Sequence, residues 1–290
     1  MMSSEVFDLA LCLFLIGAVD VGAQWYVSRH PALRHRVRRL RKAFRDHPFS
    51  VFACRSFAVV SDGRKEDVSA RIETLLPRIV AKLEAIGVRK PPLPSPDICI
   101  FKEWKNYQLC SEWAAGRKRL WTGGNFFPHR NVIVADISEG YGVVIHELVH
   151  AYVHRNMPYC PVWLNEGLAN LFASHSDDSY DLWAFRDGPM RDTLAAFREH
   201  RALSVERLCS LPFNAFHIDD EARNYAQSTS LCLYLERKGL LKDFCDDFRK
   251  NHRKDPTGYC TIQRVLGRDD KSMEAFQRTW EVFLLASYKG

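Results

Sequence analysis

The sequence predicts an α+β fold in which a mixed N-terminal lobe is followed by a mostly helical C-terminal lobe. Two patterns lead to this prediction. Up to residue 136, short apolar runs bounded by Gly, Pro, Asp and Asn accompany a single long segment of helical periodicity. From residue 141 onward, apolar side chains recur mainly at the spacing of amphipathic helices. The length of 290 residues suits one large domain or two closely joined lobes.

The N-terminal lobe is expected to be a small mixed sheet packed against one helix. Residues 66–86 carry apolar side chains at helical spacing, with a kink expected at Pro77. Gly123-Gly124 interrupts one strand, either to let another group approach the backbone closely or as a hairpin turn. The strands are expected over residues 57–60, 97–101, 119–127 and 131–136.

The C-terminal lobe is expected to consist of helices joined by short connections, with no internal repeat. We place these helices near residues 141–155, 161–174, 190–200, 220–238, 240–252 and 270–288.

The formal net charge of +6 comes from one short stretch. The eight basic side chains of this stretch are Arg29, Arg34, Arg36, Arg38, Arg39, Arg41, Lys42 and Arg45. The rest of the chain is close to neutral, so a nucleic-acid partner is not expected. A basic run that directly follows an apolar segment is more typical of a membrane-topology signal.

The apolar segment at the N-terminus allows three interpretations. Residues 6–27 are mostly apolar but include Asp8 and Asp20, and the uninterrupted run covers only residues 9–19. The segment is either a membrane-spanning anchor, a signal peptide cut after Ala23, or an amphipathic surface helix. The basic cluster favours an anchor with the C-terminal part in the cytoplasm, and secretion after cleavage is the alternative. We divide the chain into an apolar segment (1–28), a basic juxtamembrane stretch (29–50) and one domain (51–290).

The nine cysteines are expected to be reduced. No two of them form a C-x-x-C pair, and several lie in apolar runs, as Cys99 and Cys232 do. A zinc ribbon or a disulfide framework is therefore not expected.

His146-Glu147-Leu148-Val149-His150 forms an H-E-x-x-H motif within a predicted helix. Residues i and i+4 lie on one face of a helix, so both imidazoles can bind one zinc ion. Glu147 can then contact a water molecule on the metal without binding the ion, which is the position of a general base.

A catalytic zinc ion needs a third protein ligand. His154 lies about 12 Å along the helix from His146, too far to share one ion. Glu166 is the better candidate, because a helix that begins at Pro161 can fold back against the first one. Asn170, at i+4 from Glu166, is the expected partner for the outer nitrogen of a histidine ligand.

These motifs resemble those of the peptidase MA-like domains of gluzincin metallopeptidases. The resemblance rests on residues 146–150, on Pro161 to Ala169 and on Tyr225 to Ser228. It implies a zincin-like fold with the metal site between the lobes, one Zn²⁺ per chain and hydrolysis of a peptide or protein substrate. It also implies His146, His150 and Glu166 as ligands, Glu147 as catalytic base and Tyr225 as an oxyanion donor.

If residues 131–136 form the sheet edge beside the metal site, they could bind the substrate as an added strand. Two rival functions keep the same motif. One is a non-catalytic binding or scaffold protein with this fold at a membrane, and the other is a membrane-surface protein with structural zinc. The intact Glu147 and the three-ligand set favour an enzyme over both.

Overall fold

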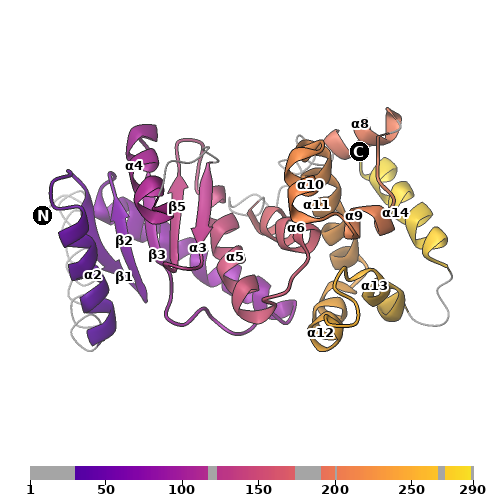
Figure 1. Ribbon diagram of the computed structural model, residues 1–290, viewed down its shortest axis with the longest axis horizontal. Coiled ribbons are helices and arrows are strands. Elements are labelled where there is room, and N and C mark those ends of the chain that lie inside the picture. The colour runs from indigo at the N-terminus through magenta and orange to yellow at the C-terminus, as the bar shows by residue number, and fades with distance from the viewer. Residues whose placement is uncertain (1–29, 117–122, 174–190, 200, 267–271, 289–290) are drawn as a thin grey trace, which may run out of the picture.

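The computed structural model describes residues 30–116, 123–173, 191–199, 201–266 and 272–288. Figure 1 shows an elongated molecule with a sheet-containing lobe at the N-terminal end and a lobe of helices at the other. The predicted α+β class is confirmed. The larger of the two hydrophobic clusters runs through both lobes, from Phe52 in the sheet to Leu284 in the last helix, so the lobes share one core.

Within the described residues, the sheet has five strands in the order β1-β2-β3-β5-β4. The central strands β2, β3 and β5 run parallel to one another, whereas β1 and β4 pair antiparallel at the two edges. The register sets Val59 opposite Ile98 and Ile98 opposite Ile133. The strands are β1 (Ser50–Cys54), β2 (Phe57–Ser61), β3 (Asp97–Phe101), β4 (Gly124–Phe127) and β5 (Val132–Asp136).

Helices cover both faces of the sheet. Helices α2 (Pro31–Ala43) and α4 (Trp104–Ala115) pack on one face, and α3 (Lys65–Ala85) and α5 (Gly142–Asn156) pack on the other. Alternate strand residues therefore enter different clusters: Ile98 faces α3 and α5, whereas Cys99 faces α2 and α4. Burial on both faces explains why the central strands are continuous apolar runs.

The basic stretch folds onto this sheet as helix α2. Leu33, Val37 and Leu40 form a narrow apolar stripe that is buried against the strands. Arg36 donates a hydrogen bond of 2.6 Å to Asp97, and Arg39 also pairs with this buried carboxylate. The apolar stripe is hidden among arginines in the sequence, so periodicity did not predict this helix.

The C-terminal lobe is organised around helix α11, which packs against α6, α8, α10, α12 and α14. Its helices are α6 (Val162–Ala173), α8 (Arg191–Arg198), α9 (Val205–Cys209), α10 (Phe213–Ile218), α11 (Glu221–Arg237), α12 (Leu241–Asn251), α13 (Tyr259–Leu266) and α14 (Met273–Tyr288).

The predicted helices of both lobes and the strands β2, β3, β4 and β5 are present, with shifted ends. The sequence did not predict β1, α4 or the short helices α9, α10 and α13. The described cysteines are free, and Cys99 and Cys232 are fully buried.

The apolar segment of residues 1–28 lies outside the described residues, as does the first part of the strand expected over 119–127. None of the helices in the described part of the chain has the length and apolar character needed to cross a membrane.

Candidate metal centre

Helix α5 carries the H-E-x-x-H motif, although its first turns are poor helix formers. Val143, Val144 and Ile145 are β-branched, and no side chain caps the N-terminus. Burial compensates for this, because Val144, Ile145, Leu148 and Val149 are packed in the core beneath the sheet. The helix is therefore held by its tertiary contacts, and these fix the direction in which its histidines point.

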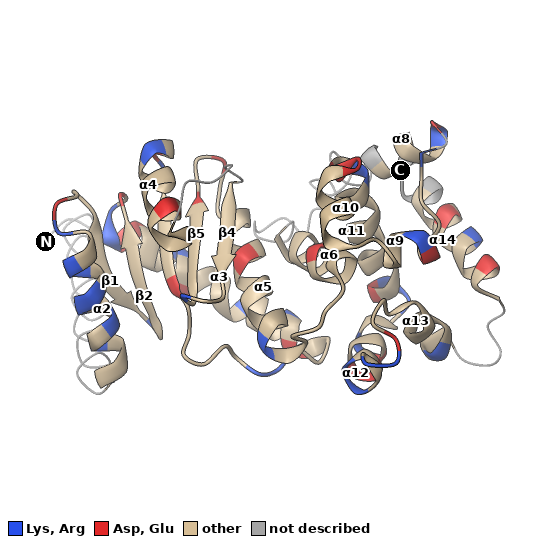
Figure 2. Ribbon diagram, in the orientation of Figure 1, with Lys and Arg blue, Asp and Glu red and all other residues tan. Residues whose placement is uncertain are grey.

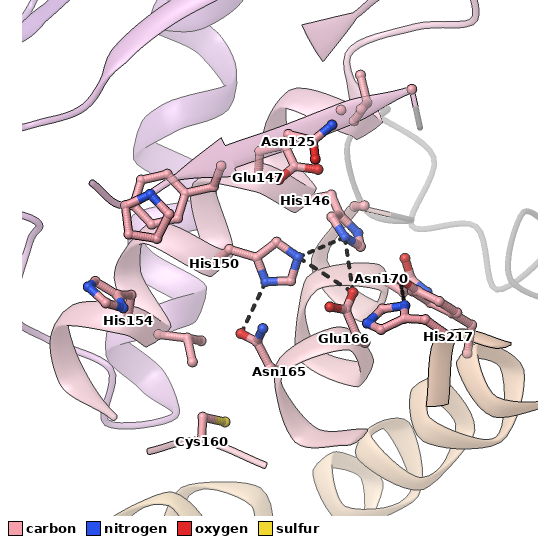
Figure 3. Close-up of a pocket in the computed structure, with 18 of the residues that line it drawn as sticks. Asn125, His146, Glu147, His150, His154, Cys160, Asn165, Glu166, Asn170 and His217 are labelled. Atoms are coloured by element: carbon pink, nitrogen blue, oxygen red, sulfur yellow. Dashed lines mark hydrogen bonds and ion pairs between the residues drawn. The ribbon is translucent and has the colours of Figure 1, made fainter. Parts of the chain in front are cut away.

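The three predicted ligand side chains converge on one point. His146 Nε2 and His150 Nε2 lie 2.9 Å apart, and Glu166 Oε2 lies 3.4 Å and 3.5 Å from them. All three ligand atoms lie within 4.8 Å of one another. Figure 3 shows both imidazole rings and the Glu166 carboxylate pointing at a common centre.

These distances fit a tetrahedral zinc site. Ligands at about 2.0–2.1 Å from an ion, at tetrahedral angles, lie about 3.3 Å from one another. The observed separations of 2.9, 3.4 and 3.5 Å fall around this value. Glu166 Oε2 is also buried and has no hydrogen-bond partner in the described part of the chain, so a cation between the three groups would satisfy it.

Helix α6 places Glu166 against α5. Pro161 directly precedes this helix, and Trp163 anchors its first turn by donating a 2.8 Å hydrogen bond to the Thr257 carbonyl. On the other side, a Cβ atom at Gly167 would lie 2.6 Å from the Ser228 carbonyl oxygen of α11. Glycine therefore permits the close approach of α6 and α11 that holds Glu166 in place.

The centre is electrostatically prepared for a positive charge. Burial raises the pKa of the Glu166 carboxyl, but the two histidines outweigh it and hold this pKa well below its ordinary value. Burial lowers the pKa of His150, and the Glu166 carboxylate outweighs it and raises this pKa to about 9. A buried carboxylate that stays ionised attracts a cation into the space beside it.

Asn165 orients His150 in the structure. His150 Nδ1 lies 3.0 Å from Asn165 Oδ1, a position from which an Nδ1–H can donate to the amide oxygen while Nε2 points toward the centre. Asn165, and not Asn170, makes this contact with His150. The sequence did not predict this role of Asn165, which is adjacent to Glu166 in the chain. Which face of α6 points toward His150 depends on how α5 and α6 pack.

His154 lies apart from the centre, as its spacing predicted. Its ring contacts Phe126 edge-on, with ring centroids 6.0 Å apart. It lines the same cavity but is not among the three converging ligand groups.

Glu147 is buried beneath the edge strand β4. Its carboxylate receives a hydrogen bond from the backbone N–H of Phe126, and burial raises its pKa above the ordinary value. A Cβ atom at Gly124 would lie 2.8 Å from Glu147 Oε1 and 2.5 Å from Val143. Of the two roles considered for Gly123-Gly124, close approach therefore applies to Gly124.

The strand at the sheet edge differs from the prediction. Residues 131–136 were considered as the edge, but β5 is paired on both sides, with β3 and with β4. The edge beside α5 is β4, because a turn at residues 128–131 folds it back along β5. Sequence order alone does not distinguish the two strands of a hairpin.

Tyr225 lies at the cavity side of α11 near Glu166. Burial and the Glu166 carboxylate raise the pKa of its phenol, so it stays protonated. Its hydroxyl lies 3.3 Å from Nδ1 of His217, a residue of α10 that the sequence did not single out. No sequence pattern singles out His217, since it lies in a short helix whose position only the fold determines.

A cavity of about 1070 Å³ opens over these groups. It is bounded by β4, α5, α6, α10 and the start of α11, and therefore lies between the two lobes. Its lining includes Asn125, His146, Glu147, His150, Met157, Cys160, Asn165, Glu166, Asn170, Phe213, His217 and Tyr225.

Comparison of the chain with models of known protein families gives no match, and comparison with curated protein sequences gives none.

Proposed function

We propose that this protein is a zinc-dependent metallopeptidase of the gluzincin type with a zincin-like fold. His146, His150 and Glu166 would hold one Zn²⁺ per chain, and Glu147 would act as general base. The observation that carries the proposal is the tetrahedral spacing of the three ligand atoms beside the buried Glu147 carboxylate. Chance matches to H-E-x-x-H have no reason to place a third acidic ligand at this spacing.

Zinc, when bound, supplies a Lewis acid that activates a water molecule and polarises the scissile carbonyl. Glu147 accepts the proton of the attacking water and delivers it to the leaving amine, a task for which a raised pKa is suited. Tyr225 stays protonated and donates a hydrogen bond to the carbonyl oxygen as negative charge develops.

A polypeptide is the substrate that the cavity accommodates best. Strand β4 forms one wall, and among the described residues it pairs with β5 alone, so its other edge can pair with an extended chain. Backbone pairing of this kind would hold the scissile bond over the centre, and it does not depend on which side chains the substrate carries.

Attachment to a membrane through residues 1–28 is part of this proposal. The basic stretch that follows the apolar segment favours an orientation with the catalytic part in the cytoplasm. The topology is tested by protease protection in intact cells. Recovery of a soluble extracellular form that begins near Gln24 would support cleavage and secretion.

Metal analysis combined with a cleavage assay tests the proposed enzyme. We expect one zinc per chain, lost on substituting His146, His150 or Glu166 with Ala and kept in His154→Ala, the matched control on the same helix. The wild type should also cleave members of a diverse peptide library. Full zinc content in Glu166→Ala would contradict the three-ligand site. Zinc binding without cleavage of any peptide would favour the scaffold function.

A further inference from the structure

We propose that the exposed side of helix α2 binds the surface of an anionic phospholipid bilayer. The relevant side chains are Arg34, Arg38, Arg41 and Lys42, which we call the basic face. All four are exposed, whereas the opposite side of α2 is buried in the core of the sheet lobe. Figure 2 shows basic residues along this helix at the outer end of the molecule. The proposal does not depend on the metal centre or on peptidase activity.

The basic face follows from helical geometry. At about 100° per residue, the four positions fall within an arc of about 100°, so their side chains project in the same direction. The helix contains no acidic residue that could neutralise them. Four like charges on one surface repel one another, and contact with an anionic surface removes this repulsion.

The charges of the basic face have no acidic partner within the described residues. The ion pairs of α2 with the sheet belong to Arg36 and Arg39, which share the single carboxylate of Asp97. Arg41 donates to the Val51 carbonyl oxygen, which leaves its net charge unchanged. The four charges therefore remain available for an external partner.

The sheet holds this face outward. Asp97 is almost fully buried and pairs with both arginines, and Arg36 also donates to the carbonyl oxygens of Ser56 and Pro96. These contacts prevent α2 from rotating about its axis. A rigid, flat array of charges suits a planar surface, and it sets the orientation of the protein on that surface.

A bilayer is a better partner than a nucleic acid for this face. The mostly apolar residues 6–27 end four residues before α2 begins, so any membrane contact of that segment brings α2 within reach of the headgroups. Outside the basic stretch the chain is close to neutral, and a further group of basic residues, Arg249, Lys250, Arg253 and Lys254, lies in the helical lobe, so it does not extend the basic face into a path for a nucleic-acid backbone. The cavity is lined by other elements, so docking through α2 leaves it open.

The test measures binding of the full-length chain to vesicles of phosphatidylcholine with and without 30% phosphatidylserine. The variant R34Q/R38Q/R41Q/K42Q removes the basic face while keeping good helix formers. The control R237Q/K250Q/R253Q/K254Q removes the same charge from exposed positions of the helical lobe. Hydrogen exchange of residues 31–43 is measured on both kinds of vesicle.

We expect phosphatidylserine to increase vesicle binding of the wild type and of the control, and to slow exchange in α2. Each basic residue near an anionic surface increases the binding constant about fivefold. The increase in binding caused by phosphatidylserine should therefore be about 100-fold or more smaller for the basic-face variant than for the wild type. High salt should weaken this increase in the same way.

Three results would overturn the proposal. One is equal loss in both variants, which would mean that net charge alone acts. Another is unchanged exchange in α2 on phosphatidylserine vesicles, even if residues 1–28 bind them. The third is tighter binding to duplex DNA than to phosphatidylserine vesicles, lost in the basic-face variant, which would assign the face to nucleic acid.

Discussion

Glu147 and the three proposed ligand residues are of types that are common on protein surfaces. Their burial and their neighbours distinguish them here. Glu147 is buried under strand β4 with a raised pKa, while Glu166 is buried between two histidines with a lowered pKa. The two carboxyl groups thus differ in their readiness to accept a proton, although they lie in one cavity. This difference supports the proposed roles of Glu147 as base and Glu166 as metal ligand.

Glu147→Gln should keep the zinc and the fold but lose most of the activity. The amide preserves the volume of the side chain, and it cannot accept the proton of the attacking water. Loss of a general base typically costs about 10²–10⁴ in rate. Zinc content, thermal unfolding and turnover of a cleaved peptide are the measurements. Cleavage at the wild-type rate would show that the assigned base is wrong.

Tyr225→Phe should lower turnover less than Glu147→Gln does, by about 10- to 100-fold, because one hydrogen-bond donor is lost and the metal remains. Zinc content should not change. Tyr159→Phe is the matched control, since Tyr159 is 68% exposed and stacks on His252. Equal turnover of the Tyr225 variant and the wild type would leave this hydroxyl without a catalytic role.

At the scale of elements, the site depends on how close β4 and α5 approach. The antiparallel hairpin of β4 and β5 brings Gly124 against Glu147, and no side chain fits between them. Helices α6 and α11 also approach each other closely, at Gly167. Glycines therefore bound the centre on two sides, each where a Cβ atom would meet a neighbour at under 3.0 Å.

Gly124→Ala should reduce turnover much more than Gly123→Ala does. The added methyl group would meet Val143 and the Glu147 carboxylate, which must shift away from the position of the attacking water. A Cβ atom at Gly123 would meet none of the described residues within 4 Å, which makes it the matched control. Turnover of the two variants, each with zinc content determined, is the measurement. Equal activity of both would mean that the contact at Gly124 does not position Glu147.

Asp97→Ala should detach helix α2 from the sheet. The substitution leaves the mostly buried Arg36 without its partner, and breaking a buried pair typically costs about 3–5 kcal/mol of unfolding free energy. Asp46→Ala, at an ion pair whose partners are more than 70% exposed, should change it by less than about 0.5 kcal/mol. Urea unfolding of both variants tests this. Equal stability would mean that the apolar stripe alone holds α2.

At the scale of the whole molecule, the proposed zinc ion would join the two lobes. Helix α5 belongs to the layers around the sheet, whereas α6 begins the helical lobe, so the ligands come from both. An ion that binds only the folded chain stabilises it by mass action.

Zinc should therefore raise the midpoint of thermal unfolding. At 100 times the dissociation constant, the gain is about 2.7 kcal/mol, or about 5–10 °C for a chain of this size. Chelation should reverse the shift, and Glu166→Ala should abolish most of it. An equal shift in this variant would place the stabilising zinc at another site.

How much the sequence predicts depends on whether a feature is local. Helical periodicity predicted α3, α11 and α12, and four-residue spacing predicted that His146 and His150 share one face. Helix α2 was missed because six basic residues obscure its apolar stripe, and β1 because its partner β2 determines its pairing. The identity of the edge strand was also missed, because pairing order is not a local property.

The sequence by itself determined the helix of the H-E-x-x-H motif, the α+β class and the separation of His154 from the point at which His146 and His150 converge. These follow from the rise and turn of a helix, which act over a few residues. Only the tertiary structure decided that Asn165 orients His150, that Gly124 lies on Glu147, and that His217 reaches Tyr225. Each of these contacts joins separate elements, and packing of the shared core fixes their relative positions.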